Sequence, residues 1–111
     1  MNISSSASKN PSPNGSLYAA SKAALDAITL SLSKELSARN IRVNVVAPGP
    51  TVTEGIHDLG VLGTPGEEFM IKATPLGRLG QPEDIAAVVV FMVSEAAGWI
   101  TGDWIKASGG L

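Results

Sequence analysis

The chain has 111 residues, of which 44% are hydrophobic and 16% charged, and it carries a formal net charge of -2. This composition predicts one globular domain, and the weak acidity excludes a basic surface for nucleic-acid phosphates. The longest apolar run, residues 85–93, is too short to cross a bilayer, so no membrane segment is predicted. The absence of cysteine and the single histidine exclude a disulfide framework and a multi-ligand thiolate or histidine metal site, and we expect a cytoplasmic protein.

The first half of the chain predicts a strand end, a loop, a helix and a second strand. The opening MNIS is β-prone, and a loop rich in Ser, Pro and Gly extends to Gly15. Over residues 16–38 one apolar stripe repeats at three- and four-residue steps and predicts a long helix, with the stripe made by Leu25, Ile28, Leu32 and Leu36. Residues 41–48 predict a core strand whose one side carries Ile41, Val43, Val45 and Ala47.

The second half predicts two helices that each begin with a proline. Thr64 is expected to cap the first, with Pro65 at its first position and Glu67 three residues after the cap, and this helix extends to about residue 73. The second begins at QPED, continues as a buried helix through the apolar run, and stops near Gly98. A last strand is predicted at 103–108, and the alternation of strands and helices indicates an α/β fold with parallel strands.

One pair of polar residues stands out on the first predicted helix. Tyr18, the single tyrosine, and Lys22 are four residues apart, which is about 6 Å of rise and about 40° of rotation, so both side chains leave the same face. An ammonium group near a phenol favours the phenolate and lowers its pKa, which would make Tyr18 a usable general acid or base. On spacing alone the favoured interpretation is a half-buried aromatic ring and a solvated lysine, without a catalytic role.

Four further motifs accompany this pair in a fixed order. Ser5 stands at the end of the first strand, thirteen residues before Tyr18, and APGPTVT follows the next strand. PLGRLGQPEDIA at 75–86 and ITGDWIKASGG at 100–110 come after it. The series resembles the short-chain dehydrogenase/reductase family along the whole chain, and within it the proteins similar to 3-oxoacyl-carrier-protein reductase.

The resemblance implies a site and a reaction. Ser5 would hydrogen-bond a substrate carbonyl, Tyr18 would be the general acid or base, and Lys22 would lower the pKa of Tyr18 and hold the nicotinamide ribose. Pro48 and Gly49 would form the loop under the nicotinamide, and the backbone of Thr51 and the hydroxyl of Thr53 would meet its carboxamide. The implied activity is reduction of a small carbonyl compound or oxidation of an alcohol with NAD or NADP, in a homo-oligomer.

Other conspicuous residues are not assigned to catalysis. His57 lies in a stretch that resembles the variable substrate lid of the family, and we expect it to be exposed. Arg78 is expected to hold local structure through ion pairs, with a docking patch for an acidic carrier protein as the alternative. Trp99 and Trp104 are expected to be packing or interface anchors, and Asn44 to satisfy backbone groups near its strand.

The largest departure from the family pattern is an absence. No glycine-rich turn for the pyrophosphate is present, nor the residue that selects NAD or NADP. The expected fold is therefore the C-terminal half of a Rossmann-like doubly wound parallel sheet, a single partial domain over 1–111 in a truncated chain, with its first strand as an unpaired edge. An inactive remnant or assembly module without cofactor binding stays as the alternative to an active oxidoreductase.

Overall fold

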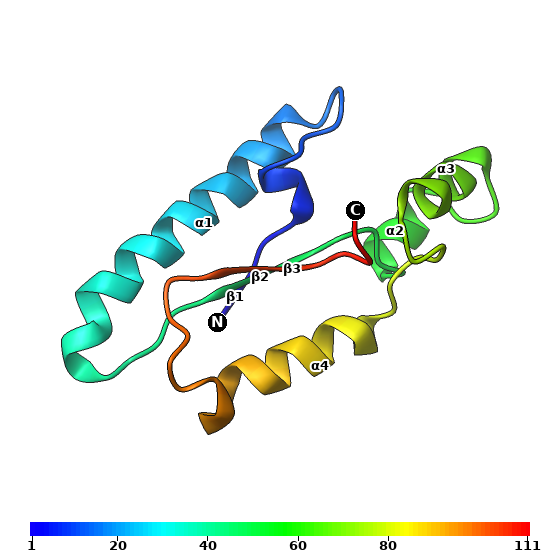
Figure 1. Ribbon diagram of the computed structural model, residues 1–111. Helices are drawn as coiled ribbons and strands as arrows, with labels where there is room; N and C mark the ends of the chain where they lie inside the picture. The colour runs from blue at the N-terminus through cyan, green and yellow to red at the C-terminus, as the bar shows by residue number, and fades with distance from the viewer.

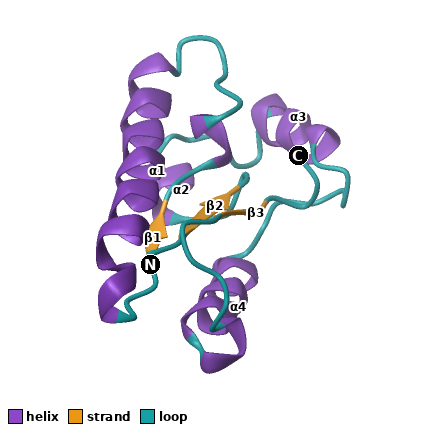
Figure 2. Cartoon of the chain, turned by 60° about the vertical axis from the view of Figure 1, so that its left-hand side comes forward, coloured by secondary structure: helices purple, strands orange, loops and turns teal.

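The computed structural model describes residues 1–111 and contains one sheet of three parallel strands. The strands are β1 (Asn2–Ile3), β2 (Val45–Pro48) and β3 (Trp104–Ala107), and β2 lies between the other two. Helix α1 (Ser16–Leu36) covers one face of the sheet and α4 (Pro82–Val93) the other, as Figures 1 and 2 show. The short helices α2 (Glu54–Asp58) and α3 (Pro65–Ala73) lie beyond the carboxyl ends of the strands. The predicted parallel α/β architecture is confirmed.

The core is centred on β2, where every residue from Val43 to Ala47 is buried. The sequence predicted alternation with one apolar side, but helices cover both faces of the sheet, so both sets of side chains are buried. The prediction that Ile41 lies on the buried side is wrong, because Ile41 precedes the paired part of the strand and is 39% exposed. Asn44 is buried and bonds the carbonyl of Ile100 and the amide of Asp103, which confirms its structural role.

Helix α1 packs on the sheet through small residues. Its bounds agree with the predicted 16–38, because a 3₁₀ turn at Ser37–Arg39 extends it. The residues of α1 in deepest contact are Ala19, Thr29 and Ser33, whereas Ile28 of the predicted stripe is 51% exposed. Thr29 accepts a hydrogen bond from the Asn2 side chain at 2.9 Å, so polar contacts fix part of this interface. Small side chains let the helix approach the strands closely, and Leu25, Leu32 and Leu36 of the predicted stripe lie partly buried beside them.

Helix α4 begins where the sequence predicted but is neither as long nor as buried. Met92 is its one buried residue, while Val90, Phe91 and Val93 are each about half exposed or more. The prediction of a fully buried helix is therefore wrong, because only one side of the helix rests on the sheet. The helix ends at Val93, and a 3₁₀ turn (η3, Glu95–Ala97) occupies the residues before Gly98.

A guanidinium group explains the early end of α4. The Arg42 side chain donates to the carbonyls of Met92 at 2.9 Å, Ser94 at 3.1 Å and Ile100 at 3.3 Å. Carbonyls in the last turn of a helix have no partner inside it, and a cation is favourable at this end of the helix dipole. Arg42 thus caps α4 from the residues that lead into β2.

The start of α3 follows the predicted capping pattern. The Thr64 hydroxyl accepts the amide of Gly66 at 3.2 Å, and Pro65 occupies the first turn. The Glu67 carboxylate accepts the amide of Gly63 at 2.6 Å, one residue before the cap. These contacts confirm the predicted start of the helix, and its last residue, Ala73, agrees with the predicted end.

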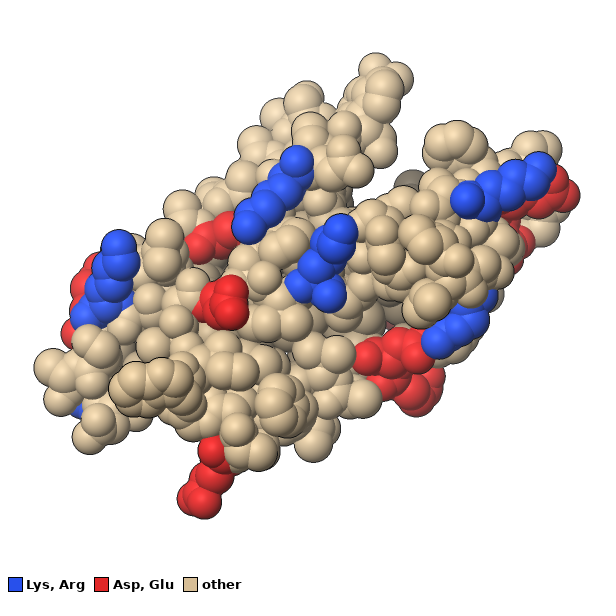
Figure 3. Space-filling model, in the orientation of Figure 1, with Lys and Arg blue, Asp and Glu red and all other residues tan.

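The surface carries scattered charges and several exposed large apolar side chains. On the face shown in Figure 3, basic and acidic side chains are interspersed and most of the area is uncharged. β1 pairs with β2 alone, which confirms the predicted free edge. No helix has the length and apolar character needed to span a membrane.

Candidate functional site

The predicted catalytic residues come from β1 and from the start of α1. β1 ends at Ile3, and Ser5 follows it as the cap of the 3₁₀ turn η1 (Ser6–Ser8). Tyr18 lies in the first turn of α1, and Lys22 lies one turn further along. Figure 1 shows η1 beside the first turns of α1, so chain segments separated by a polar loop meet at the carboxyl end of the sheet.

Lys22 connects the helix to the end of β1. Its ammonium donates to the carbonyl of Ile3 at 3.1 Å and lies 5.8 Å from the centroid of the Tyr18 ring. The Ser4 hydroxyl donates to the carbonyl of Lys22 at 3.3 Å, which fixes the same helical turn against the strand from the other direction. Tyr18 is 54% exposed, so its ring is free to meet a ligand. The predicted placement of Tyr18 and Lys22 on one face is confirmed.

Ser5 keeps a donor available. Its Oγ accepts the amide of Ala7 at 3.2 Å, which uses one lone pair and leaves the hydroxyl hydrogen without a protein acceptor. A hydroxyl with one accepted bond can still donate to an outside oxygen. Because the Ile3 carbonyl that binds Lys22 is two residues before Ser5, the three predicted residues occupy one corner of the molecule.

The loop after β2 lies against the loop after β3. The amide of Gly49 donates to the carbonyl of Ala107 at 3.0 Å, and a Cβ on Gly49 would lie 2.7 Å from Cβ of Ser108. Only glycine fits such an approach. Pro48 is the last residue of β2, so Pro48 and Gly49 together carry the chain out of the sheet along a fixed path.

Thr51 and Thr53 differ in how free they are. The buried Thr51 donates its hydroxyl to the carbonyl of Gly49 at 2.9 Å and pairs with Gly80 in an isolated parallel bridge. That bridge uses the carbonyl of Pro50 and the amide of Val52, so the amide and carbonyl of Thr51 stay outside it. Thr53 is exposed at the cap of α2, and its hydroxyl caps no amide. The available groups are therefore the Thr51 backbone and the Thr53 hydroxyl.

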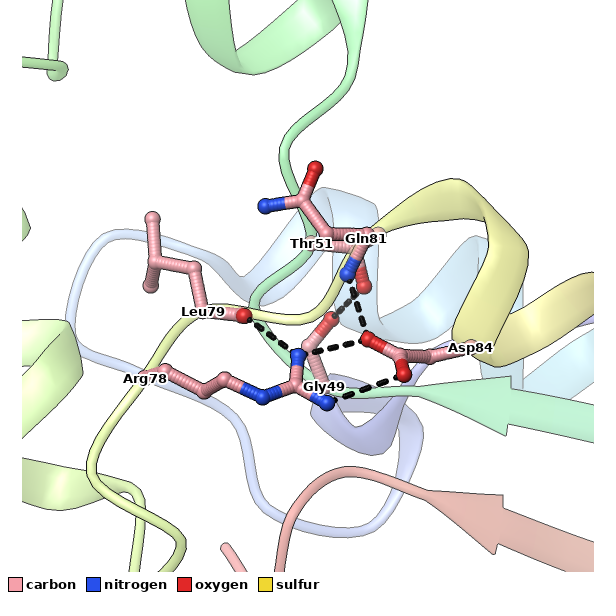
Figure 4. Close-up of polar contacts among 6 residues, drawn as sticks. All are labelled: Gly49, Thr51, Arg78, Leu79, Gln81 and Asp84. Atoms are coloured by element: carbon pink, nitrogen blue, oxygen red, sulfur yellow. Dashed lines mark hydrogen bonds and ion pairs between the residues drawn. The ribbon is translucent and has the colours of Figure 1, made fainter.

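The segment that pairs with Thr51 contains an ion pair between Arg78 and Asp84. Arg78 donates to both carboxylate oxygens of Asp84, at 2.6 and 2.9 Å, and to the carbonyl of Leu79 at 3.0 Å (Figure 4). The Arg78 hydrogen bonds, followed by the amide of Gln81, lower the pKa of Asp84 to about 2, and Asp84 raises the pKa of Arg78. This confirms that Arg78 holds local structure. Sequence reasoning placed Asp84 at a helix start but did not pair it with Arg78.

The remaining conspicuous residues differ in their exposure. His57 is exposed on α2, as expected. Trp99 is fully exposed and Trp104 is partly buried. No group of three or more acidic or histidine side chains is arranged to hold a metal ion. A cavity of about 560 Å³ opens behind the loop, between Thr51, Arg78, Val88 and Gly109, and it does not include Ser5, Tyr18 or Lys22.

The chain is similar to known proteins along its whole length. The family model described as enoyl-(acyl carrier protein) reductase, a short-chain dehydrogenase model, matches residues 1–111. The chain is 50% identical over 111 residues to an uncharacterised oxidoreductase of Methylorubrum extorquens, covering 100% of this chain and 45% of the relative. It is 40% identical to a 3-oxoacyl-[acyl-carrier-protein] reductase of Chlamydia pneumoniae, covering 100% of this chain and 44% of the relative.

Solved structures show the same backbone. The angucycline C-6 ketoreductase LanV with bound NADP superimposes with a TM-score of 0.88 at 40% identity, over 98% of this chain and 41% of that one. A 7α-hydroxysteroid dehydrogenase in complex with NADH and 7-oxo glycochenodeoxycholic acid superimposes with a TM-score of 0.87 at 39% identity, over 97% of this chain and 42% of that one. The chain therefore spans less than half the length of the relatives it matches, and it corresponds to the C-terminal part of their Rossmann-like fold. With its whole length matched, the chain belongs to the short-chain dehydrogenase/reductase family.

Proposed function

We propose that the chain contributes the catalytic corner of an NAD(P)-dependent oxidoreductase that reduces a small carbonyl compound or oxidises the corresponding alcohol. The observation that carries the proposal is the placement of Lys22. Its ammonium is fixed on the Ile3 carbonyl and lies 5.8 Å from the Tyr18 ring, beside the strand end that leads to Ser5. A phenol, an ammonium and a free hydroxyl at the carboxyl end of a parallel sheet form a set suited to proton transfer at a carbonyl oxygen.

The chemistry follows from the groups that remain free. Ser5 would donate its hydroxyl hydrogen to the substrate oxygen, and this preorganised bond strengthens as negative charge develops there. Tyr18 would give its proton to that oxygen in reduction and take it back in oxidation. The dinucleotide supplies or accepts the hydride when it is bound. The Lys22 ammonium would face the Tyr18 ring, where its positive charge would stabilise the negative charge that develops on the phenol oxygen during proton transfer.

The residues present fit the nicotinamide end of such a cofactor. Lys22 and Tyr18 would meet the ribose hydroxyls, while the loop of Pro48 and Gly49 would lie under the ring. The free backbone of Thr51 and the unengaged hydroxyl of Thr53 would meet the carboxamide. Two related structures carry NADP and NADH respectively, so the proposal covers both cofactors.

Incomplete coverage supports a second candidate. The chain spans 41–45% of the relatives reported above, and β1 has no strand on its outer side. Large apolar side chains are exposed on α1 and α4, among them Leu17 and Val90. Such surfaces favour association, so the second candidate is a non-catalytic assembly module. In both candidates we propose a homo-oligomer in the cytoplasm, formed through the outer face of α1 and the region of α4 and β3.

A titration separates the two candidates. The purified chain is mixed with NADH or NADPH while nicotinamide fluorescence is followed, and oxidation of the bound cofactor by a panel of ketones is measured. An active chain binds saturably and turns over, and Tyr18→Phe retains binding while losing turnover because the proton donor is removed. His57→Gln is the matched control, since His57 is exposed and lies outside the proposed chemistry. Absence of saturable binding by either cofactor would refute the catalytic proposal and favour the assembly module.

A further inference from the structure

The turn after β1 fixes the direction of the Ser5 hydroxyl. Ser5 Oγ accepts the amide of Ala7 at 3.2 Å, and the carbonyl of Ser5 accepts the amide of Ser8 at 3.0 Å. Both contacts are made with η1, so the hydroxyl moves whenever this turn moves. A group that donates to a developing charge must be held within fractions of an ångström to be effective. What anchors η1 therefore decides how well Ser5 is placed.

The segment that follows Ser5 packs against α1 but makes few polar contacts outside itself. The hydrogen bonds of residues 6–14 are local, for example from the amides of Lys9 and Asn10 to the carbonyl of Ser6. None of the residues of η1 is fully buried, and residues 9–14 are exposed. The Ser8 hydroxyl is covered but has no hydrogen-bond partner. The backbone of this segment thus gives no long-range polar contact to hold the turn.

Lys9 provides that contact. Its Nζ lies 3.9 Å from the centroid of the Trp104 ring, well inside the range of about 6 Å for a cation–π interaction. Lys9 is also the cap of η1, so the contact acts at the end of the turn opposite to Ser5. It is the one cation–π or polar side-chain contact that joins residues 6–14 to the sheet.

Trp104 belongs to the sheet, on the face where η1 packs. It opens β3, and its backbone is in register with Val45, which is itself in register with Asn2. Residues in register on parallel strands share a face, and the Asn2 side chain bonds α1, so the indole lies on the face where η1 packs. The indole Nε1 is covered and has no partner. The partly buried ring presents its face to Lys9.

The contact also crosses the sheet. β1 and β3 are separated by β2, which places Asn2 and Trp104 about 10 Å apart, two strand spacings. Lys9 follows β1 in the chain, and its ammonium lies over the Trp104 ring on β3. The contact therefore connects the edge strand β1 with β3 across β2. Movement of the turn away from the sheet would have to break this contact.

We propose that Lys9 is a positioning residue that holds the Ser5 turn through its cation–π contact with Trp104. The catalytic consequence rests on the proposed function, whereas the positioning itself does not. Lys9 touches neither the substrate oxygen nor the cofactor in this arrangement. It acts on the reaction only through the place of the Ser5 hydroxyl.

The first test measures order in the turn without any activity. In a Trp99→Phe background, which leaves Trp104 as the single indole, Lys9→Met is compared with Lys9→Arg and with the exposed control Lys34→Met. We expect the ¹⁵N order parameter of Ala7 to fall from about 0.85 to below about 0.6 in Lys9→Met only, with a shift of Trp104 emission. Lys9→Arg should behave as the unsubstituted chain, because guanidinium also stacks on indole. An unchanged Ala7 order parameter in Lys9→Met overturns the proposal.

The second test shows whether Lys9 acts through Ser5. Lys9→Met is expected to lower kcat about fivefold with KM for the cofactor unchanged, a loss that corresponds to about 1 kcal/mol. In a Ser5→Ala background the same substitution should have no further effect, because the group it positions is gone. An equal loss of kcat with Ser5 present and in the Ser5→Ala background overturns the proposal. A chain that turns over no substrate refutes the proposed function, and the order parameters then decide the role of Lys9 by themselves.

Discussion

Replacement of Arg42 by alanine should destabilise the fold more than replacement of any other exposed or half-exposed cation. The substitution removes three hydrogen bonds that Arg42 donates to backbone carbonyls, one in the last turn of α4 and two in the residues after it. Hydrogen bonds from a charged group contribute about 1.5–3 kcal/mol each, and two of the three are shorter than 3.2 Å. Taking these two at the low end gives about 3 kcal/mol, which includes the favourable interaction with the helix dipole.

The measurement is a pair of unfolding curves, one with urea and one with heat. For a domain of this size we expect the Tm of Arg42→Ala to fall by about 12 °C, with an unchanged urea m-value. The Tm of Arg42→Lys should lie between those of the unsubstituted chain and Arg42→Ala, since an ammonium keeps the charge but not the forked geometry. Arg39→Ala is the matched control: Arg39 is exposed, three residues away and makes no side-chain hydrogen bond, so its effect should stay within about 0.5 kcal/mol. An Arg42→Ala chain that is no less stable than Arg39→Ala refutes the reasoning.

Three further outcomes are expected. Gly49→Ala should cost about 1–3 kcal/mol in urea unfolding, because the new methyl would lie 2.7 Å from Cβ of Ser108, whereas Gly55→Ala, with nothing nearer than 3.9 Å, should cost nothing. The folded-state pKa of Asp84, about 2, lies below its usual value of about 3.9, so the Arg78–Asp84 pair should stabilise fully above about pH 4 and lose its contribution as the pH falls towards 2. The difference in urea midpoint between the chain and Asp84→Asn should accordingly shrink over that interval, and a constant difference would contradict it. Val90→Glu should shift sedimentation towards smaller species, because Val90 is an apolar side chain that is 67% exposed, and an unchanged sedimentation profile would exclude Val90 from the proposed interface.

The parts of the fold that were predictable are those encoded within a few residues. The start of α3 is given by a threonine, a proline and a glutamate in adjacent positions, and the structure uses all three. The spacing of Tyr18 and Lys22 likewise needs only the geometry of one helix. These interactions are local, so neither depends on how the rest of the chain folds.

Contacts between distant segments were beyond a reading of the sequence. Arg42 caps a helix that ends about 50 residues later, and Lys9 stacks on a ring 95 residues away. Nothing in the local pattern of either residue indicates its partner. The most deeply buried residues of α1 were missed for another reason. Ala19, Thr29 and Ser33 are small or polar, whereas a search for hydrophobic periodicity selects the neighbouring leucines, which are only partly buried.

The order of the strands has a consequence for how the protein reaches its native state. Asn2 pairs with Val45, 43 residues away, and Val45 pairs with Trp104, 59 residues away. Contacts of such separation form slowly, because a long loop must close before any of them is made. Helix α1 can form early from local contacts, but β2 acquires its second neighbour only when the last dozen residues are available. During synthesis on the ribosome, the central strand must therefore wait with one side unpaired, and this interval is when a nascent chain is most open to mispairing.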